Sequence, residues 1–214
     1  MKTAAHYEHK STGYGIGHTR LRRILELAGD VKGKRIIDAG CARGYLGAQF
    51  RERGAYVVGL DISSEVVAQA REKLDEAYPA DLEETWPREL AENTFDMVVL
   101  AETLEHVFDP VAVLKQAHRV LKPGGSVLIT TPNFLTWTNR IGFLFGNFRY
   151  RSEGMFDFGH IRWFTYPYLR QVLRESGFVV VKERHIIFPG KLTRLLKRWP
   201  SVFAWQFIVK AEKI

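Results

Sequence analysis

A glycine-bearing turn near the start of the chain constrains the fold more than any other feature. Residues 34–39 predict a short buried strand, and residues 45–53 predict a helix; the turn between them contains Gly40 and Gly44. Small residues let the backbone approach a ligand closely, and N–H groups at a helix start attract an anion or a carboxylate. Because many α/β domains have such a turn for packing reasons alone, its meaning depends on the segments that follow.

Strand-like and helix-like segments alternate through the first 130 residues. The predicted strands are residues 34–39, 56–62, 77–81, 95–101 and 126–130. The predicted helices are residues 19–27, 45–53, 64–77 and a segment that begins at Asp109 and ends at residues 122–125. Continuously apolar strands that alternate with helices imply a parallel sheet covered by helices on both faces.

The C-terminal part departs from this alternation. Residues 178–187 and 203–211 predict two strands that pair antiparallel at a sheet edge, with a short basic helix at residues 191–199 between them and another helix at 167–176 before them. Residues 133–159 are rich in aromatics and arginines and too few for a domain. We therefore expect one domain over residues 1–214, with an N-terminal cap at 1–29 and an acceptor lid at 133–165.

Three aspartates at or near the carboxyl ends of the predicted strands narrow the choice of ligand. Asp61 ends the second strand, where a carboxylate can accept hydrogen bonds from ribose hydroxyls, and Asp81 follows the third. A dinucleotide site would need Gly-x-Gly-x-x-Gly, whereas this turn has Gly40-x-x-x-Gly44. Asp38, just before the turn, would repel a pyrophosphate but attract an ammonium group. The pattern therefore favours S-adenosylmethionine.

With these motifs the chain resembles the class I methyltransferases that use S-adenosylmethionine. The matching pieces, in the family's order, are residues 37–44, 59–61, 80–82, 95–99, 104–107 and 121–125. The resemblance implies a Rossmann-like α/β fold with a seven-stranded sheet of order 3-2-1-4-5-7-6, the last strand antiparallel. One departure is Ala42, where the family has a third glycine. An alanine methyl fits there if φ is negative, so we expect slightly altered cofactor contacts and no loss of binding.

The resemblance also implies roles for individual residues. The cofactor-binding set is Asp38, Gly40, Cys41, Ala42, Gly44, Asp61, Ile62, Asp81, Leu82, Ala101 and Glu102. The turn would line the methionine end, with Asp38 favouring the ammonium through water. Asp61 would take the ribose hydroxyls, while Asp81 and the Leu82 N–H would take the adenine. Ala101 and Glu102 would lie under the reactive methyl group.

Two histidines are candidates for catalysis, because imidazole can accept a proton at neutral pH. His106 follows the fourth strand, and His160 lies in the expected lid. A packing or anchoring role is the alternative for each. We expect no metal site: with one cysteine, Cys41, the chain has neither a disulfide framework nor a Cys-rich zinc site.

The charge is distributed unevenly. Lys and Arg total 31 against 24 Asp and Glu, a formal net charge of +7. Residues 1–132 have 17 basic and 19 acidic groups, and residues 133–214 have 14 and 5, so all of the surplus lies in the second part. A basic, aromatic segment at 134–151 suits an anionic membrane surface or a lipid- or glycan-linked acceptor. It suits an RNA less well, because the sequence has no RNA-binding motif.

The downstream segments 132–134 and 159–165 are similar to a subset of the family. This subset includes methionine-biosynthesis methyltransferase-like proteins, ubiquinone-type O-methyltransferases and enzymes acting on glycans or secondary metabolites. We therefore expect transfer of a methyl group to an oxygen atom of a small-molecule, glycan or quinone-like acceptor. The alternatives are a regulatory protein that activates a partner in methionine-type biosynthesis and an RNA methyltransferase. The sequence has no secretory signal pattern and indicates a cytoplasmic protein, with peripheral membrane contact as an option; its oligomeric state stays open.

Overall fold

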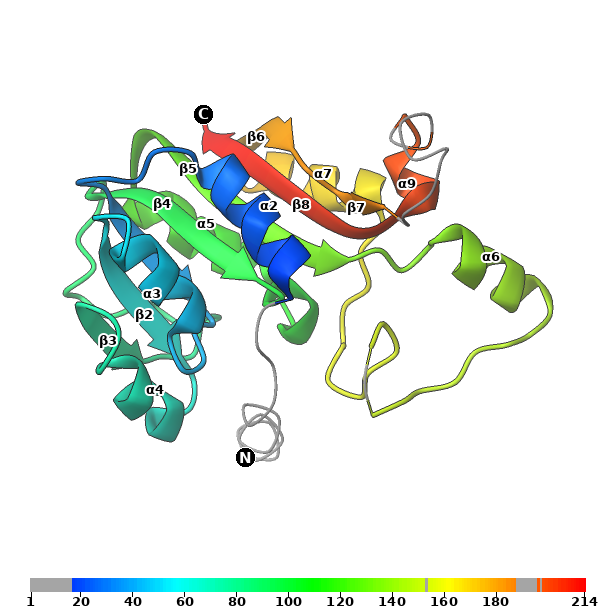
Figure 1. Ribbon diagram of the computed structural model, residues 1–214, viewed down its shortest axis with the longest axis horizontal. Helices are drawn as coiled ribbons and strands as arrows, with labels where there is room; N and C mark the ends of the chain where they lie inside the picture. The colour runs from blue at the N-terminus through cyan, green and yellow to red at the C-terminus, as the bar shows by residue number, and fades with distance from the viewer. Residues whose placement is uncertain (1–16, 153, 188–195, 197) are drawn as a thin grey trace.

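The computed structural model describes residues 17–152, 154–187, 196 and 198–214. Its strands are β1 Arg35–Ala39, β2 Tyr56–Asp61, β3 Glu76–Pro79, β4 Phe95–Ala101, β5 Leu121–Pro132, β6 Phe178–Glu183, β7 Ile186–Ile187 and β8 Ala204–Lys213. Its helices are α2 His18–Ala28, α3 Tyr45–Arg51, α4 Ser64–Ala70, the 3₁₀ turn η1 Leu104–His106, α5 Pro110–Val120, α6 Trp137–Leu144, α7 Tyr166–Glu175 and α9 Pro200–Phe203. Figure 1 shows their arrangement.

One mixed sheet organises the described residues. Its order is β3-β2-β1-β4-β5-β8-β6, with β7 also paired to β8. The first five strands run parallel, and β8 runs antiparallel to both β5 and β6. With β8 as the seventh strand, the predicted order and the antiparallel last strand are confirmed.

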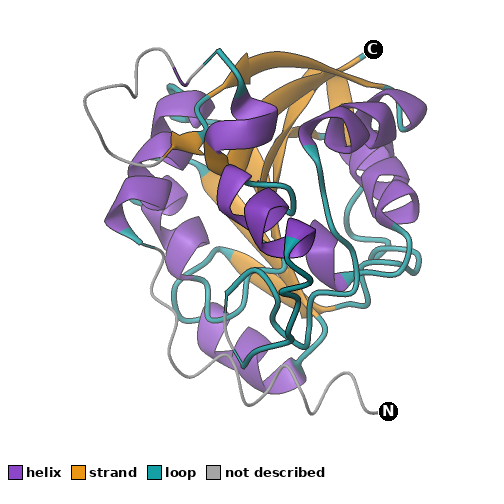
Figure 2. Cartoon of the chain, turned by 90° about the vertical axis from the view of Figure 1, so that its right-hand side faces the viewer, coloured by secondary structure: helices purple, strands orange, loops and turns teal. Residues whose placement is uncertain are grey.

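The sheet is buried on both faces. Figure 2 shows helices on either side of it. On one face α2, α3 and α4 pack Ile24, Phe50 and Val67 against the strands, and on the other α5 and α7 contribute Leu114 and Leu169. Both faces of the central strands are therefore apolar, as their continuous hydrophobic sequences predict.

The predicted helix at 64–77 is wrong in its second half, because α4 ends at Ala70. The chain then turns so that Asp75 binds the N–H of Val57 through its carboxylate, at 2.8 Å, and leads directly into β3. The turn also buries Leu74, whose side chain occupies the space above Gly44, Gly47 and Gly59. Tertiary packing of Leu74 thus overrides the local helical pattern.

The C-terminal strands also differ from prediction in their extent. β5 begins at Leu121, five residues before the expected start, and pairs with β4 across a register shift. The expected strand 178–187 is divided into β6 and β7 by Arg184 and His185. There, the Arg184 N–H donates to the carbonyl of Ile208, and the Ile208 N–H donates to the His185 ring, so β8 pairs with both pieces.

The insert between β5 and α7, residues 133–165, leaves the sheet at the end of β5 and returns to the same place. Asn133 and Phe164 form an isolated parallel bridge, and the Phe134 N–H donates to the Phe164 carbonyl at 2.9 Å. Between these ends the chain forms α6 and a long loop that project beyond the carboxyl end of β5 (Figure 1). The first sixteen residues of the expected N-terminal cap, and most of the expected basic helix at 191–199, lie outside the described residues.

Candidate active site

A cavity of about 820 Å³ opens at the carboxyl ends of the parallel strands. This is the end at which open α/β sheets bind their ligands, and the volume is within the range of about 300–1,000 Å³ for small-molecule sites. The expected lid forms part of its wall through Gly154, Met155, Asp157 and His160. All of the predicted site residues except Asp38, Cys41 and Gly44 line the cavity.

The turn after β1 is shaped by close packing. Gly40 has a φ of 81°, and a Cβ at this position would lie 2.7 Å from the Thr103 Oγ1. The N–H groups of Gly40 and Cys41 both donate to the carbonyl of Leu60, which holds the turn against β2. Packing against Thr103 therefore explains why glycine is needed at this position, and the backbone of Gly40 also lines the cavity.

Ala42 corrects one expectation. Its φ is 45°, in the left-handed region that favours glycine, and not the negative value at which an alanine methyl fits without strain. The residue stays in this conformation because its N–H donates to the Oδ2 of Asp61 at 2.9 Å. Ala42 therefore reproduces the backbone of a glycine at this position, with some strain, and adds a methyl group to the cavity wall.

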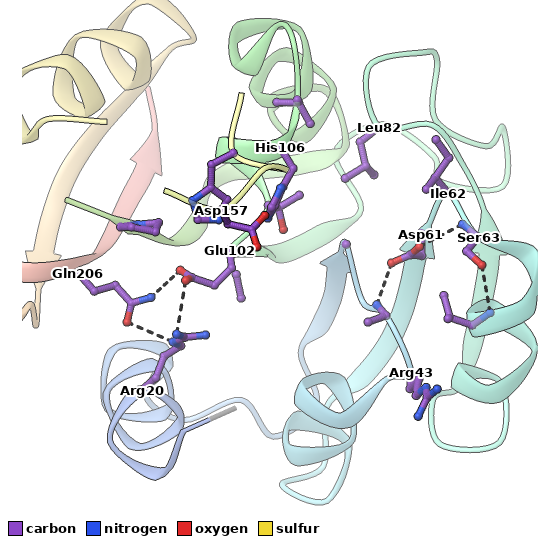
Figure 3. A pocket seen from close by; sticks show the side chains of 18 of the residues that line it. Arg20, Arg43, Asp61, Ile62, Ser63, Leu82, Glu102, His106, Asp157 and Gln206 are labelled. Carbon is purple, nitrogen blue, oxygen red and sulfur yellow. Dashed lines mark hydrogen bonds and ion pairs between the residues drawn. The ribbon is translucent and has the colours of Figure 1, made fainter. Parts of the chain in front are cut away.

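Asp61 lies at the end of β2 with both carboxylate oxygens engaged. Besides the Ala42 N–H on Oδ2, the Ser63 N–H donates to Oδ1 at 3.1 Å (Figure 3). Burial raises the pKa of Asp61, and these N–H groups act in the opposite direction. A carboxylate oxygen has two lone pairs, so each can still accept a hydroxyl from the cavity.

The three predicted residues that do not line the cavity lie behind its wall. Asp38 is 2% exposed; its burial raises the pKa from 3.8 to about 7, with the Gly47 N–H opposing this and the Asp61 charge adding to it. Cys41 packs against Gly59, and burial raises the pKa of its thiol, which makes it inert. Gly44 packs against Ala70.

Beyond β3, Asp81, Leu82 and Glu83 form the opposite end of the cavity. Asp81 accepts the N–H of Glu83 at 3.0 Å. The Glu83 carboxylate in turn accepts the N–H groups of Phe108 and Asp109, at 3.0 and 2.7 Å. These contacts join the loop after β3 to the start of α5 and enclose this end of the cavity.

Glu102 follows β4 and is the most constrained residue of the site. Its φ of 58° is positive, and its Oε1 accepts hydrogen bonds from Thr130 Oγ1 and Gln206 Nε2 at 2.8 and 2.5 Å. Arg20 of α2 lies 3.4 Å from Oε2 and also donates to Gln206 at 3.1 Å (Figure 3). Backbone strain held by three side chains is typical of a functional position.

The two predicted histidines are brought together although 54 positions separate them. Their ring centroids lie 4.8 Å apart in an edge-to-face arrangement. The His106 Nδ1 lies 2.8 Å from the carbonyl of Gly159, and the His160 Nδ1 lies 3.0 Å from that of Met155. Glu105, beside His106, is 1% exposed. Burial, and to a lesser extent the Glu102 charge, raises its pKa well above the ordinary value.

Several cavity residues were not predicted. They are Arg20, Arg43, Tyr45, Ser63, Val66, Glu83, Thr103, Val107, Phe108, Pro132, Gly154, Met155, Asp157, Trp205 and Gln206. Ser63, Thr103 and Phe108 neighbour predicted positions, so a wider window around each motif would have included them. Arg20 and Gln206 carry no such signal, because the antiparallel return of β8 and the packing of α2 against it bring them to the site.

The comparisons with known proteins identify the fold and the cofactor. The sequence profile of the methyltransferase domain family matches residues 14–183, most of the chain. The chain therefore belongs to this family, and its fold and family define an S-adenosylmethionine-dependent methyltransferase.

The sequence relatives carry a more particular name. The chain is 37% identical over 124 residues to the ubiquinone biosynthesis O-methyltransferase of Pseudomonas aeruginosa (strain PAO1), covering 56% of this chain and 53% of that protein. It is 36% identical over 122 residues to the protein of the same name from Aliivibrio fischeri (strain MJ11), covering 55% and 52%. The chain thus spans about half the length of these relatives.

Solved structures share the fold at low identity. A SAM-dependent methyltransferase from Archaeoglobus fulgidus superposes with a TM-score of 0.70 at 21% identity, covering 97% of this chain and 98% of that one. A chain from a complex of the Haloferax volcanii Trm112 methyltransferase activator with a methyltransferase gives 0.65 at 18% identity, covering 99% and 94%. Within the described residues, no helix has the length and apolar character needed to cross a membrane.

Proposed function

We propose that this methyltransferase transfers its methyl group to an oxygen atom of a small hydroxylated acceptor, of a quinone-like or glycan class. The observation that carries the proposal is the construction of the cavity, which has a turn and a carboxylate on one wall and two histidines on the other. The names of the relatives support an oxygen acceptor, over about half their length.

The first wall suits the cofactor. Asp61 can accept the ribose hydroxyls on the lone pairs that its backbone partners leave available. The exposed backbone at Gly40 and Ala42 can lie along the methionine end, while Asp38 lies buried behind the turn, where its raised pKa leaves it only partly ionised at neutral pH. The Arg20 guanidinium lines the cavity next to Glu102 and suits the methionine carboxylate.

The second wall would hold the acceptor. S-adenosylmethionine supplies a methyl group already activated on a sulfonium, so the protein has mainly to align the acceptor oxygen and exclude water. His106, His160 and Met155 line the part of the cavity to which the insert contributes. Imidazole groups can take the hydroxyl proton at neutral pH. We therefore place the acceptor between these histidines and the turn.

A two-stage experiment tests this proposal. S-adenosylhomocysteine binding is measured by isothermal titration for the wild type, Asp61→Asn and the exposed control Glu65→Gln. We expect Asp61→Asn to weaken binding at least tenfold and Glu65→Gln to leave it unchanged. No binding by the wild type, or unaltered binding by Asp61→Asn, would contradict the cofactor assignment.

The acceptor is then tested with labelled S-adenosylmethionine. Hydroxylated polyprenyl phenols, short glycans and RNA are offered separately, and the methylated product is identified by mass spectrometry. We expect an O-methylated phenol or glycan. Label in RNA, or none in any extractable molecule, would contradict the proposed acceptor class, even if the cofactor binds.

We also propose that the insert contacts an anionic membrane surface where the acceptor resides. Leu144 and Phe145, at the end of α6, are each 80% exposed. Arg140, Arg149 and Arg151 lie in the same insert. Exposed apolar groups with arginines are the combination that binds acidic lipid headgroups.

Vesicle sedimentation tests this contact. We expect the protein to bind phosphatidylglycerol-containing vesicles at low salt, to bind pure phosphatidylcholine weakly, and to lose binding as salt screens the charges. Replacing Leu144 and Phe145 together by serine should reduce binding several-fold. The matched control replaces Val179 and Val181, 43% and 42% exposed on β6, by serine. Equal loss in both variants, or no binding to anionic vesicles, would refute the contact.

A further inference from the structure

Glu105, His106 and His160 form a side-chain cluster that lies apart from the cofactor-binding turn after β1 and from Asp61. One donor atom from each lies within 4.8 Å of those of the other two. Glu105 and His106 come from η1 after β4, and His160 comes from the insert, so the cluster joins the sheet to the expected lid. Both histidines line the cavity.

The Glu105 carboxyl group is the least expected member of the cluster. It is 1% exposed, and within the described part of the chain neither of its oxygens forms a hydrogen bond of regular geometry, although the Thr131 hydroxyl lies close enough to lower its pKa slightly. Burying a carboxylate without hydrogen-bonding or charged partners is strongly unfavourable, so such groups are normally paired or bound to a cation. Among the described residues Arg20 acts on Glu105 electrostatically, but its guanidinium pairs with Glu102 at 3.4 Å and forms no ion pair with Glu105.

The two histidines are oriented by the backbone. A carbonyl oxygen can only accept, so the neutral rings of His106 and His160 must donate from Nδ1 to Gly159 and Met155. In this tautomer Nε2 carries the lone pair. Metal-binding histidines are fixed in the same way, by a hydrogen bond from the other ring nitrogen to a carbonyl or carboxylate.

Asp157 supports this arrangement from the insert. It is 4% exposed, and its Oδ1 accepts the Gly159 N–H at 2.6 Å, while its carbonyl accepts the His160 N–H at 3.0 Å. The same short turn thus positions the His160 ring and the carbonyl that orients His106. Figure 3 shows Asp157 beside His106 and Glu102 at the cavity wall.

From this geometry we propose that Glu105, His106 and His160 bind a divalent transition-metal cation of the zinc, manganese or iron type. Two imidazole nitrogens and one carboxylate favour these ions over magnesium or calcium, which prefer oxygen ligands. Metal–ligand bonds of about 2.0–2.2 Å place donor atoms around one ion about 3–4 Å apart, so the cluster needs to contract by about 1 Å.

The proposal rests on the proposed function and deepens it. Three protein ligands leave coordination positions that face the cavity. An acceptor hydroxyl bound there would release its proton to water more easily. Its oxygen then forms the bond to the methyl carbon, the carbon–sulfur bond of the sulfonium breaks, and S-adenosylhomocysteine leaves. The histidines would thus act as ligands and not as direct bases, in contrast to the sequence-based expectation of no metal.

Metal binding is measured on the full chain after tag removal and chelation. Equilibrium dialysis with Zn²⁺, Mn²⁺ or Co²⁺, read by elemental analysis and by the Co²⁺ absorption spectrum, should give one ion per chain, and Mg²⁺ should bind at least tenfold more weakly. Glu105→Gln and His160→Asn should each lower Zn²⁺ affinity at least tenfold. The controls Glu65→Gln and His18→Asn, at exposed positions, should not change it.

S-adenosylhomocysteine titration and circular dichroism on the same proteins separate the possible failures. We expect Glu105→Gln and His160→Asn to remain folded and to bind S-adenosylhomocysteine normally. Wild-type protein that binds S-adenosylhomocysteine but no transition metal would overturn the metal site alone, as would Zn²⁺ affinity unchanged in both variants. Absence of S-adenosylhomocysteine binding, with stoichiometric metal, would instead contradict the proposed function.

Discussion

Asp38 shows how tertiary structure changes the chemistry of a residue. The sequence places an acid before the glycine turn, and the structure buries it so completely that its pKa rises from 3.8 to about 7. Its neighbours Cys41 and Gly44 likewise lie behind the cavity wall. A motif shows which residues belong to a turn, whereas the packing of Leu74 and Gly59 decides which of them face the ligand.

The raised pKa of Asp38 predicts a pH dependence of stability. Between about pH 4 and pH 7 the folded chain keeps a proton that the unfolded chain has lost. The Asp38 contribution to the free energy of unfolding therefore falls as pH rises through this window, by up to about 1.4 kcal/mol per pH unit. Asp38→Asn, which is neutral throughout, should flatten this part of the profile.

Urea denaturation of the wild type and Asp38→Asn at pH 5 and pH 8 measures the difference. The exposed variant Glu92→Gln is the control and should follow the wild type. If the gap between Asp38→Asn and the wild type were the same at both pH values, Asp38 would have an ordinary pKa in the folded state.

At the scale of elements, local signals predict the helix starts, whereas the end of α4 depends on tertiary packing. Asp109 and Pro110 predict the start of α5, and the Asp109 carboxylate indeed accepts the N–H groups of Val111 and Ala112 at 2.9 and 3.1 Å. The end of α4 at Ala70 depends on Leu74, which is buried among three glycines distant in sequence. A cap is a local hydrogen bond, but this helix end is a tertiary contact.

The Asp109 cap makes a measurable contribution to stability. Asp109→Ala removes the acceptor for two N–H groups at the start of α5 and should lower the free energy of unfolding by about 1 kcal/mol. The control Lys115→Ala, on the exposed side of the same helix, should change it by less than about 0.5 kcal/mol. Chemical denaturation compares the two, and equal effects would mean that the cap is not stabilising.

At the scale of the molecule, one buried asparagine holds the insert to the sheet. Asn133 is fully buried, donates to the carbonyl of Ala204 at 2.8 Å and accepts the Leu135 N–H at 3.0 Å. The bridge to Phe164 closes the insert at the same place. The insert is therefore held at the end of β5 and again at η1, where the Glu105 carbonyl accepts the N–H groups of Ile161 and Arg162 at 2.9 and 3.0 Å.

Asn133→Ala should loosen the insert without disturbing the cofactor wall. It leaves the Ala204 carbonyl and the Leu135 N–H short of a partner, at a cost of about 1–3 kcal/mol. We expect faster limited proteolysis within residues 134–163, with S-adenosylhomocysteine affinity unchanged within about twofold. Asn147→Ala, exposed in the same insert, is the control. Lost cofactor affinity in Asn133→Ala would show that the two walls are one unit.

The sequence by itself determined the alternating α/β fold and favoured the cofactor, and its resemblance to the class I methyltransferases implied the strand order. Continuous apolar strands, capped helices and short connections leave few topologies, and the motif residues are neighbours along the chain. Only the tertiary structure decided that Arg20 and Gln206 meet Glu102, and that His160 meets Glu105 and His106. These contacts join segments 50 to 190 residues apart, through the antiparallel return of β8 and the closure of the insert, and no local pattern encodes them.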